Sequence, residues 1–135
     1  MNLVQELERL LGADRVDATA AGRAQHSRGE SYAQAVYPEA VVYPRSTAEV
    51  SAVMRFAAGA GVPVTPVGAN SSLEGHTVPV AGGISLDVSR LDRVLEAHPE
   101  DLLIVVQPAV TYPRVNDHVR RHGLFFPIDP GAHAS

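Results

Sequence analysis

The spacing of hydrophobic positions predicts alternating helices and strands along the chain. Residues 3–11 repeat apolar side chains at helical spacing, and Gly12 follows as a stop signal. Residues 17–35 are small, polar and aperiodic, which indicates a loop that wraps over another part of the fold. Residues 37–43 form a short apolar stretch held between two prolines and predict a strand.

The clearest helix start is a capping box at Ser46–Glu49. The Ser46 hydroxyl is expected to accept a hydrogen bond from the Glu49 main chain, while the Glu49 side chain reaches back. Apolar positions between residues 50 and 58 form the buried stripe of this helix, and glycines at 59 and 61 end it. A strand over residues 62–65 follows at once. The strand, helix and strand predict a βαβ unit that is parallel and right-handed.

The second half of the chain predicts three further strands and one helix. Residues 83–88 alternate as a strand. Residues 94–98 and 102–107 form the arms of a hairpin that turns at Pro99. A last helix begins after Thr111 and is closed by the glycine at 123.

Length and composition fit one compact domain of mixed fold. The 135 residues are 45% hydrophobic and 19% charged, values typical of a globular chain with a core. The expected fold class is α+β (α/β). Residues 1–35 form an N-terminal helix and wrapping loop, and residues 36–135 form the domain into which they lead.

Charge and cysteine content exclude several classes of function. The chain has 11 basic and 15 acidic residues and no basic run, which argues against a nucleic-acid partner. It has no cysteine, which excludes disulfides, thiol catalysis and cysteine-ligated metals. The N-terminus lacks the basic region of a signal peptide, and no stretch reaches the about 20 apolar residues of a membrane span. A cytoplasmic protein is therefore expected.

The candidate chemistry lies in the loop over residues 66–76. It follows the second strand of the βαβ unit directly, where open α/β sheets place their ligands. Residues 68–72 have little side-chain bulk, so their main-chain N–H groups can converge on an anion. Gly68 and Asn70 both tolerate a positive φ. A tight surface turn without a ligand is the alternative, and composition does not choose between the two.

Other ligand-binding and catalytic motifs are absent from this loop. No lysine follows the glycines, no G-x-G-x-x-G occurs, and neither serine stands in G-x-S-x-G. The histidines at 26, 98, 118, 122 and 133 show no metal-ligand spacing, so no metal site is expected. Asp129, between two prolines, predicts a turn former, and Glu74 predicts a bond to the loop's own main chain.

Four segments carry a family resemblance: YPEAVVYPRSTAEV, GVPVTPVGANSSLEGHTVPVAGGISLDVSRL, DLLIVVQPAVT and HGLFFPIDPGAHAS. In this order and spacing, over residues 37–135, they resemble the FAD-binding domain of the FAD-linked oxidases, of the vanillyl-alcohol oxidase and p-cresol methylhydroxylase type. The branch they resemble most is that of D-lactate dehydrogenase and the glycolate oxidase D subunit. The resemblance implies an FAD-binding type-2 (PCMH-type) domain, in which the βαβ subdomain leads into the start of a second mixed-sheet subdomain.

The resemblance also implies a set of cofactor-binding positions. The loop over residues 68–75 would surround the FAD pyrophosphate with main-chain N–H groups, Pro44 would lie near the adenine or ribose, and the segment after Pro127 would pass near the flavin. Many relatives have Gly-x-Gly-Thr where this chain has Gly68-Ala69-Asn70-Ser71, and glycine where Ala109 stands. FAD would be held non-covalently, with His76 as a polar loop residue. The implied positions are Pro44, Val67, Gly68, Ala69, Asn70, Ser71, Ser72, Leu73, Gly75, Pro130, Gly131, Ala132 and Ser135.

The implied activity is that of a flavin-dependent 2-hydroxy-acid dehydrogenase or oxidase, of D-lactate or glycolate type, which transfers hydride from substrate to FAD. Relatives continue past the position of Ser135 into their substrate-binding and metal-binding half. The chain is therefore expected to be an N-terminal portion that contains no catalytic residue, binds FAD weakly or not at all, and oxidises nothing alone. Strands around Ile84 and Ile104 are expected to lack partners, and self-association through an exposed sheet edge follows. A non-catalytic binding or assembly module that kept the scaffold and lost the flavin is the alternative.

Overall fold

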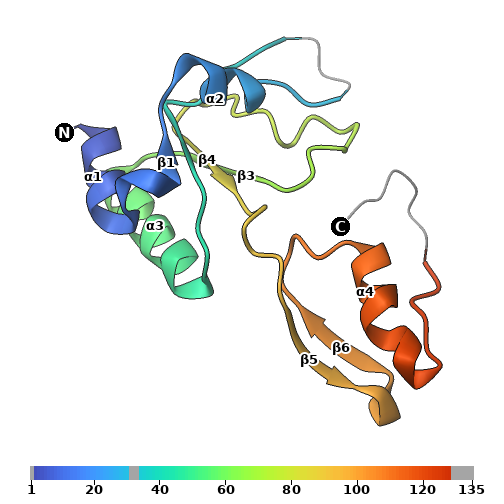
Figure 1. Ribbon diagram of the computed structural model, residues 1–135. Helices are drawn as coiled ribbons and strands as arrows, with labels where there is room; N and C mark the ends of the chain where they lie inside the picture. Colours follow the sequence, from blue (N-terminus) through green and yellow to red (C-terminus); the bar gives the residue numbers. More distant parts are fainter. Residues whose placement is uncertain (1, 31–33, 129–135) are drawn as a thin grey trace. The chain divides into compact units, whose positions relative to one another are not determined.

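The chain forms two compact units in a computed structural model that describes residues 2–30 and 34–128 (Figure 1). The first unit comprises residues 1–90 and the second residues 91–135. The sequence did not suggest a division after Arg90. Within the described residues, none of the helices combines the length and the apolar character that a bilayer span requires.

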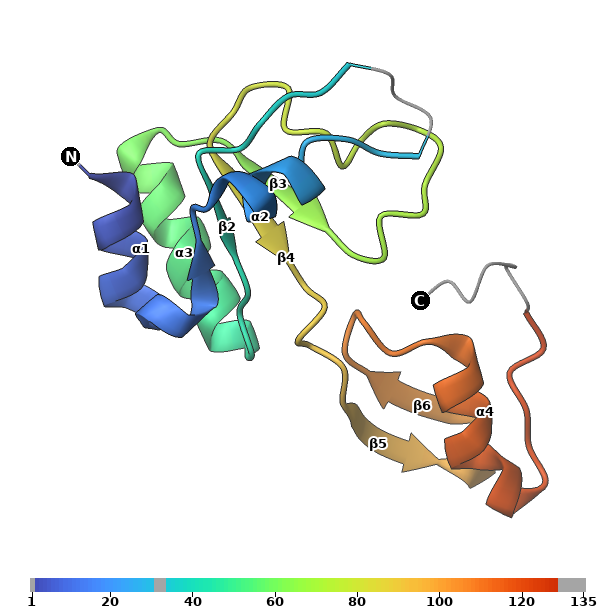
Figure 2. The ribbon, with the colours of Figure 1, turned by 45° about the horizontal axis from the view of Figure 1, so that its top comes forward.

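A four-stranded mixed sheet organises the first unit (Figure 2). Its strands are β1 (Val16–Asp17), β2 (Ala40–Val42), β3 (Val64–Val67) and β4 (Ile84–Asp87), in the order β1-β2-β4-β3. β4 runs parallel to both β2 and β3, whereas β1 is antiparallel to β2. Every residue of β2 and β4 is buried, so these two strands form the centre of the sheet.

Two helices pack beside this sheet and close the core. The helices α1 (Leu3–Leu11) and α3 (Thr47–Ala60) lie side by side in both ribbon views. A 3-10 turn over Ala13–Arg15 joins α1 to β1. The buried apolar cluster comes from these helices and from the central strands; its members are Leu3, Leu7, Leu11, Ala40, Val42, Val53, Ala57, Ile84 and Leu86.

The predicted Ser46 cap is present at the start of α3, but the Glu49 side chain reaches back to Arg45 and not to Ser46 as a capping box requires. The Ser46 hydroxyl accepts a hydrogen bond from the Glu49 N–H at 3.2 Å, and the Glu49 side chain accepts one from the Arg45 N–H at 2.7 Å. Glu49 also forms an ion pair with Arg15, which ties the start of α3 to the 3-10 turn that precedes β1. Gly61 ends the helix in the left-handed conformation at φ 66°.

The second unit consists of a hairpin and a helix. β5 (Val94–His98) pairs antiparallel with β6 (Leu103–Val106), and a 3-10 turn over Pro99–Asp101 joins them. The helix α4 (Tyr112–Val119) runs into a 3-10 turn over Arg120–His122. The predicted hairpin and last helix are therefore confirmed. The last turn of the predicted helix, before Gly123, is a 3-10 turn and not an α-helical one.

Two expectations about secondary structure are wrong. Residues 17–35 are not a continuous loop, because α2 (Ala20–Gln25) lies within them. This helix was missed because its sequence, AAGRAQ, has no apolar stripe. It is held instead by its cap, where the Thr19 hydroxyl accepts a hydrogen bond from the Gly22 N–H at 3.1 Å.

The strand around Ile84 does not lack partners. β4 lies between β2 and β3, and Ile84 is 0% exposed. The two strands of the βαβ unit run in the same direction, as predicted, but β4 is inserted between them. The strand around Ile104, β6, does have an open edge: among the described residues it pairs with one strand, β5.

Candidate functional site

The loop over residues 68–75 leaves the carboxyl end of β3. Val67, the last residue of that strand, pairs with Asp87, and the Val88 N–H donates to the Val67 carbonyl at 2.9 Å. Beyond this bond the segments that follow β3 and β4 separate, and the loop after β3 extends from the sheet edge (Figure 2). It therefore occupies the edge at which parallel sheets bind ligands.

The main chain of this loop carries a row of unpaired donors. Within the part of the chain that the structure describes, the N–H groups of residues 68–72 donate to no protein acceptor. The Glu74 N–H, by contrast, donates to the Ser72 hydroxyl at 3.2 Å. A Cβ at Gly68 would meet a single neighbour, the Val88 side chain at 4.0 Å. Five amides without an acceptor among the described residues are available to an anion with several oxygens.

Asn70 sets the direction of the loop. It takes the left-handed conformation at φ 54°, and its side-chain amide donates to the Arg28 carbonyl at 2.8 Å. Its side-chain oxygen is buried without a partner among the described residues. A Cβ at Gly29 would lie 3.2 Å from the Thr77 hydroxyl, a tight contact, and 3.8 Å from the Ser72 carbonyl. The segment over residues 28–30 thus packs directly against the loop.

A buried ion pair lies at the same sheet edge. The Nε2 atom of His26 is 2.8 Å from the Asp87 carboxylate, and the two side chains are 8% and 11% exposed. The hydrogen bond to Asp87 raises the pKa of His26, although burial opposes this shift. Burial by itself raises the pKa of Asp87, but the hydrogen bonds from His26 and Ser89 outweigh it and hold that pKa below its usual range. Sequence reasoning missed this pair because 61 positions separate its members.

The structure brings together some of the predicted cofactor-binding positions. Val67 is buried at the end of β3, the loop residues follow it, and Leu73 is exposed within the loop. Pro44 is fully buried just after β2. The other predicted positions lie outside the described residues, as does Asp129; they are Pro130, Gly131, Ala132 and Ser135.

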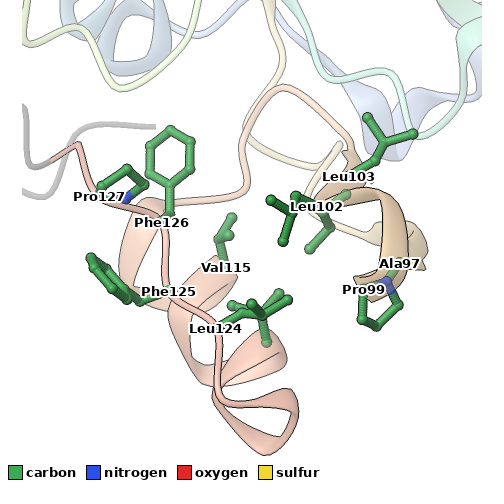
Figure 3. Close-up of a pocket in the computed structure, with 11 residues that line it drawn as sticks. Ala97, Pro99, Leu102, Leu103, Val115, Leu124, Phe125, Phe126 and Pro127 are labelled. Carbon is green, nitrogen blue, oxygen red and sulfur yellow. The ribbon is translucent and has the colours of Figure 1, made fainter.

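A separate cavity of about 390 Å³ lies within the second unit (Figure 3). The hairpin contributes Leu102 and Leu103, the helix α4 contributes Val115, and residues 124–127 complete the lining. All eleven lining residues are apolar, so this cavity holds no group for acid–base chemistry. Across residues 2–30 and 34–128, histidines and carboxylates nowhere gather in the threes that a metal ion requires.

Comparison with known proteins identifies the family. Residues 38–135 match the family model of the FAD binding domain. The chain belongs to this family. The chain is 36% identical over 133 residues to a probable mitochondrial D-lactate dehydrogenase of Danio rerio, covering 98% of this chain and 27% of that protein. It is 32% identical over 128 residues to the glycolate oxidase subunit GlcD of Bacillus subtilis, covering 95% of this chain and 27% of that subunit.

Solved structures confirm the fold of the FAD-binding domain. The chain superimposes on an alkyldihydroxyacetonephosphate synthase with a TM-score of 0.86 at 23% identity, covering 97% of this chain and 29% of that one. It superimposes on p-cresol methylhydroxylase with a TM-score of 0.76 at 20% identity, covering 98% of this chain and 27% of that one. The resemblance and the mixed fold class drawn from the sequence are therefore confirmed, and family and relatives point to FAD as the cofactor. The chain spans about a quarter of the length of these relatives, at 27% of each curated one.

Proposed function

We propose that the chain is the FAD-binding portion of a flavin-dependent 2-hydroxy-acid dehydrogenase or oxidase. Among its relatives are a probable D-lactate dehydrogenase and a glycolate oxidase subunit, and both names refer to small 2-hydroxy acids. The substrate proposed for the whole protein is therefore D-lactate, glycolate or a similar acid. No residue of this chain is proposed as catalytic; its part in the reaction is to bind and orient FAD.

The unpaired amides of residues 68–72 carry this proposal, because the diphosphate is the one part of FAD that needs several N–H donors at once. The exposed Ser71 hydroxyl lies within the same row and adds a further donor. When bound, FAD supplies an isoalloxazine ring that accepts a hydride from the substrate. His76 has a partner within the loop, since its Nδ1 lies 3.4 Å from the Ser72 hydroxyl, and we propose that it is a polar loop residue and that FAD is held non-covalently.

Titration of the chain with FAD, followed by calorimetry and flavin fluorescence, tests the proposal. Gly68→Val adds bulk to the loop, and its Cβ would make an ordinary contact with the Val88 side chain at 4.0 Å. We expect it to weaken FAD binding at least about tenfold, because it pushes the diphosphate away from the amides. Gly59→Ala is the control, since a Cβ there meets nothing within 4 Å and the residue lies in α3, outside the loop.

Three outcomes separate the candidate functions. Loss of affinity in Gly68→Val alone supports the diphosphate site. Equal, saturable binding by both variants and the parent chain would place FAD elsewhere. No binding by any of the three at about millimolar FAD, the limit of useful affinity, would favour the alternative, a non-catalytic module that kept the scaffold without the flavin.

We also infer that the second unit associates with another apolar surface, which in a solution of this chain alone is a second copy. Its hairpin turn and the segment after α4 expose Leu102, Phe125 and Ile128, at 78%, 74% and 62%. Apolar groups clustered on a surface in this way mark contact sites. β6 also has an open edge, since among the described residues it pairs with β5 alone.

A further inference from the structure

His26 is placed so that both of its ring nitrogens face acceptors. Nδ1 lies 2.9 Å from the Gly22 carbonyl, and Nε2 lies 2.8 Å from an oxygen of Asp87. A carbonyl accepts but cannot donate, and an ionised carboxylate behaves in the same way. Both hydrogen bonds therefore require a proton on each nitrogen. The geometry calls for a positively charged imidazolium at the end of α2.

Asp87 connects this charge to the edge of the sheet. One of its oxygens accepts from His26, and the other accepts from the Ser89 N–H at 2.8 Å. Asp87 also pairs in register with Val67, the last strand residue before the loop. The ion pair thus attaches α2 to the point at which the loop leaves the sheet.

The segment after His26 reaches the loop within two residues. Ser27 is 2% exposed, and its hydroxyl donates to the Ala24 carbonyl at 2.8 Å, so the chain leaves α2 in a fixed direction. Arg28 follows, and its carbonyl accepts the hydrogen bond from Asn70. A shift of His26 would therefore be transmitted directly to the residue that holds the loop in its left-handed turn.

We propose that the His26–Asp87 ion pair positions the diphosphate-binding loop. Through the two residues that follow His26, it fixes the Arg28 carbonyl, and that carbonyl holds Asn70 in the conformation that leaves the neighbouring amides free. His26 is a positioning residue and does not touch the cofactor. This inference rests on the proposed function for its effect on FAD, but its structural part can be measured without FAD.

The groups that face His26 define how it titrates. Asp87 from β4 and Asp17 from β1 are acidic, and both favour the charged ring. Tyr43, after β2, presents its ring at a centroid distance of 6.0 Å, and burial raises its pKa, so the phenol is neutral. The Arg90 guanidinium lies over the Tyr43 ring, at 4.8 Å from its centroid. The raised pKa of His26 means that the ring stays charged above its ordinary value of about 6.5 and loses its proton only as the pH rises further.

The first experiment measures FAD affinity from about pH 6 to about pH 9, across the range in which a raised histidine titrates. For the parent chain we expect affinity to fall about fivefold or more as His26 loses its proton. Asp87→Asn is the decisive variant, because the new amide can donate to a neutral His26 and both hydrogen bonds survive without charge. It is expected to keep the affinity within about twofold and to lose this pH dependence. The two proteins differ only at Asp87, so the difference between their pH profiles isolates the His26–Asp87 pair.

The second experiment follows His26 and Asn70 by NMR in the absence of FAD. The side-chain amide resonances of Asn70 are expected to shift with the same midpoint as the His26 ring, and to stay still in Asp87→Asn. Asn70→Gly allows the backbone conformation at φ 54° but removes the hydrogen bond to the Arg28 carbonyl. This variant should bind FAD more weakly, and its affinity should no longer change as His26 titrates.

Each outcome decides between the two proposals. Asn70 resonances that ignore the His26 titration would overturn the positioning role, whether or not FAD binds. The positioning role would also be overturned if the FAD affinity of the parent chain did not change as His26 titrates, or if the FAD affinity of Asp87→Asn kept the full pH dependence of the parent chain. If no FAD binds at any pH while Asn70 still follows His26, the positioning stands and the proposed function fails.

Discussion

Gly82 and Gly83 show how two identical neighbouring residues differ through their surroundings. Both have a left-handed backbone, at φ 70° and 71°. A Cβ at Gly82 would meet nothing within 4 Å, whereas one at Gly83 would lie 2.3 Å from the Pro63 carbonyl oxygen. The approach is close because β4 begins here, where the Ile84 N–H donates to the same carbonyl at 2.9 Å.

Alanine substitutions at these glycines should differ in cost. Gly82→Ala is expected to lower the free energy of unfolding by about 1–2 kcal/mol, the cost of a left-handed non-glycine residue. Gly83→Ala adds the overpacking against Pro63, about 1–3 kcal/mol more. Urea denaturation of the two variants measures the difference. Equal losses would show that β3 and β4 do not approach as described.

The pH dependence of stability follows from the buried ion pair. The pKa of His26 is raised on folding, so its contribution is complete below about pH 6.5 and is lost as the pH rises through the raised value. The pKa of Asp87 is lowered, so its contribution is present above about pH 3.9 and is lost as the pH falls. Unfolding free energy measured against pH should therefore peak between these limits.

Asp87→Asn is expected to flatten both sides of this profile. The control is Glu96→Gln, which removes the exposed pair between Glu96 and His98, whose side chains are 62% and 45% exposed. Exposed pairs contribute about 0–1 kcal/mol, so the control should keep the profile of the parent chain. A flat profile in the parent chain would contradict the charged state of His26.

Among the secondary-structure elements, α3 depends most clearly on its cap. Ser46→Ala removes the acceptor for the Glu49 N–H and is expected to lower the free energy of unfolding by about 1 kcal/mol. Ser51→Ala, at an exposed position inside the same helix, should cost nothing, because alanine has the higher helix propensity. Thermal and chemical denaturation of both variants test this. A loss in Ser51→Ala as large as that in Ser46→Ala would show that the cap is not the cause.

The helix α2 shows what local sequence does not reveal. It has six residues, and of these Gly22 is the buried one, so no periodic stripe marks it. Its stability comes from the Thr19 cap and from His26, whose partner Asp87 is distant in sequence. Elements held by long-range polar contacts are invisible to periodicity, which reports only apolar faces.

At the scale of the whole molecule, the exposed apolar side chains of the second unit have a measurable consequence. A Leu102→Lys, Phe125→Lys double variant should remove the concentration-dependent association proposed for the parent chain, because it places charge on that surface. Val80→Lys, at an isolated exposed position in the first unit, is the control and should leave association unchanged. Light scattering over a range of concentrations measures the association of the parent chain and of both variants. A parent chain that stays monomeric throughout would contradict the proposal.

The sequence by itself indicated the family through the resemblance of its four segments. It also determined the Ser46 cap of α3, the strands β3 and β4 and the position of the loop over residues 68–75. These features depend on local signals: apolar spacing, a capping pair, and small residues after a strand. Only the tertiary structure decided that β4 lies between β2 and β3, that α2 exists, and that Asn70 is clamped by Arg28. Each of these depends on contacts between residues far apart in the chain, such as the 61 positions between His26 and Asp87. Such contacts form when burial removes water from polar groups and leaves them only one another as partners, and the order of residues does not encode that choice locally.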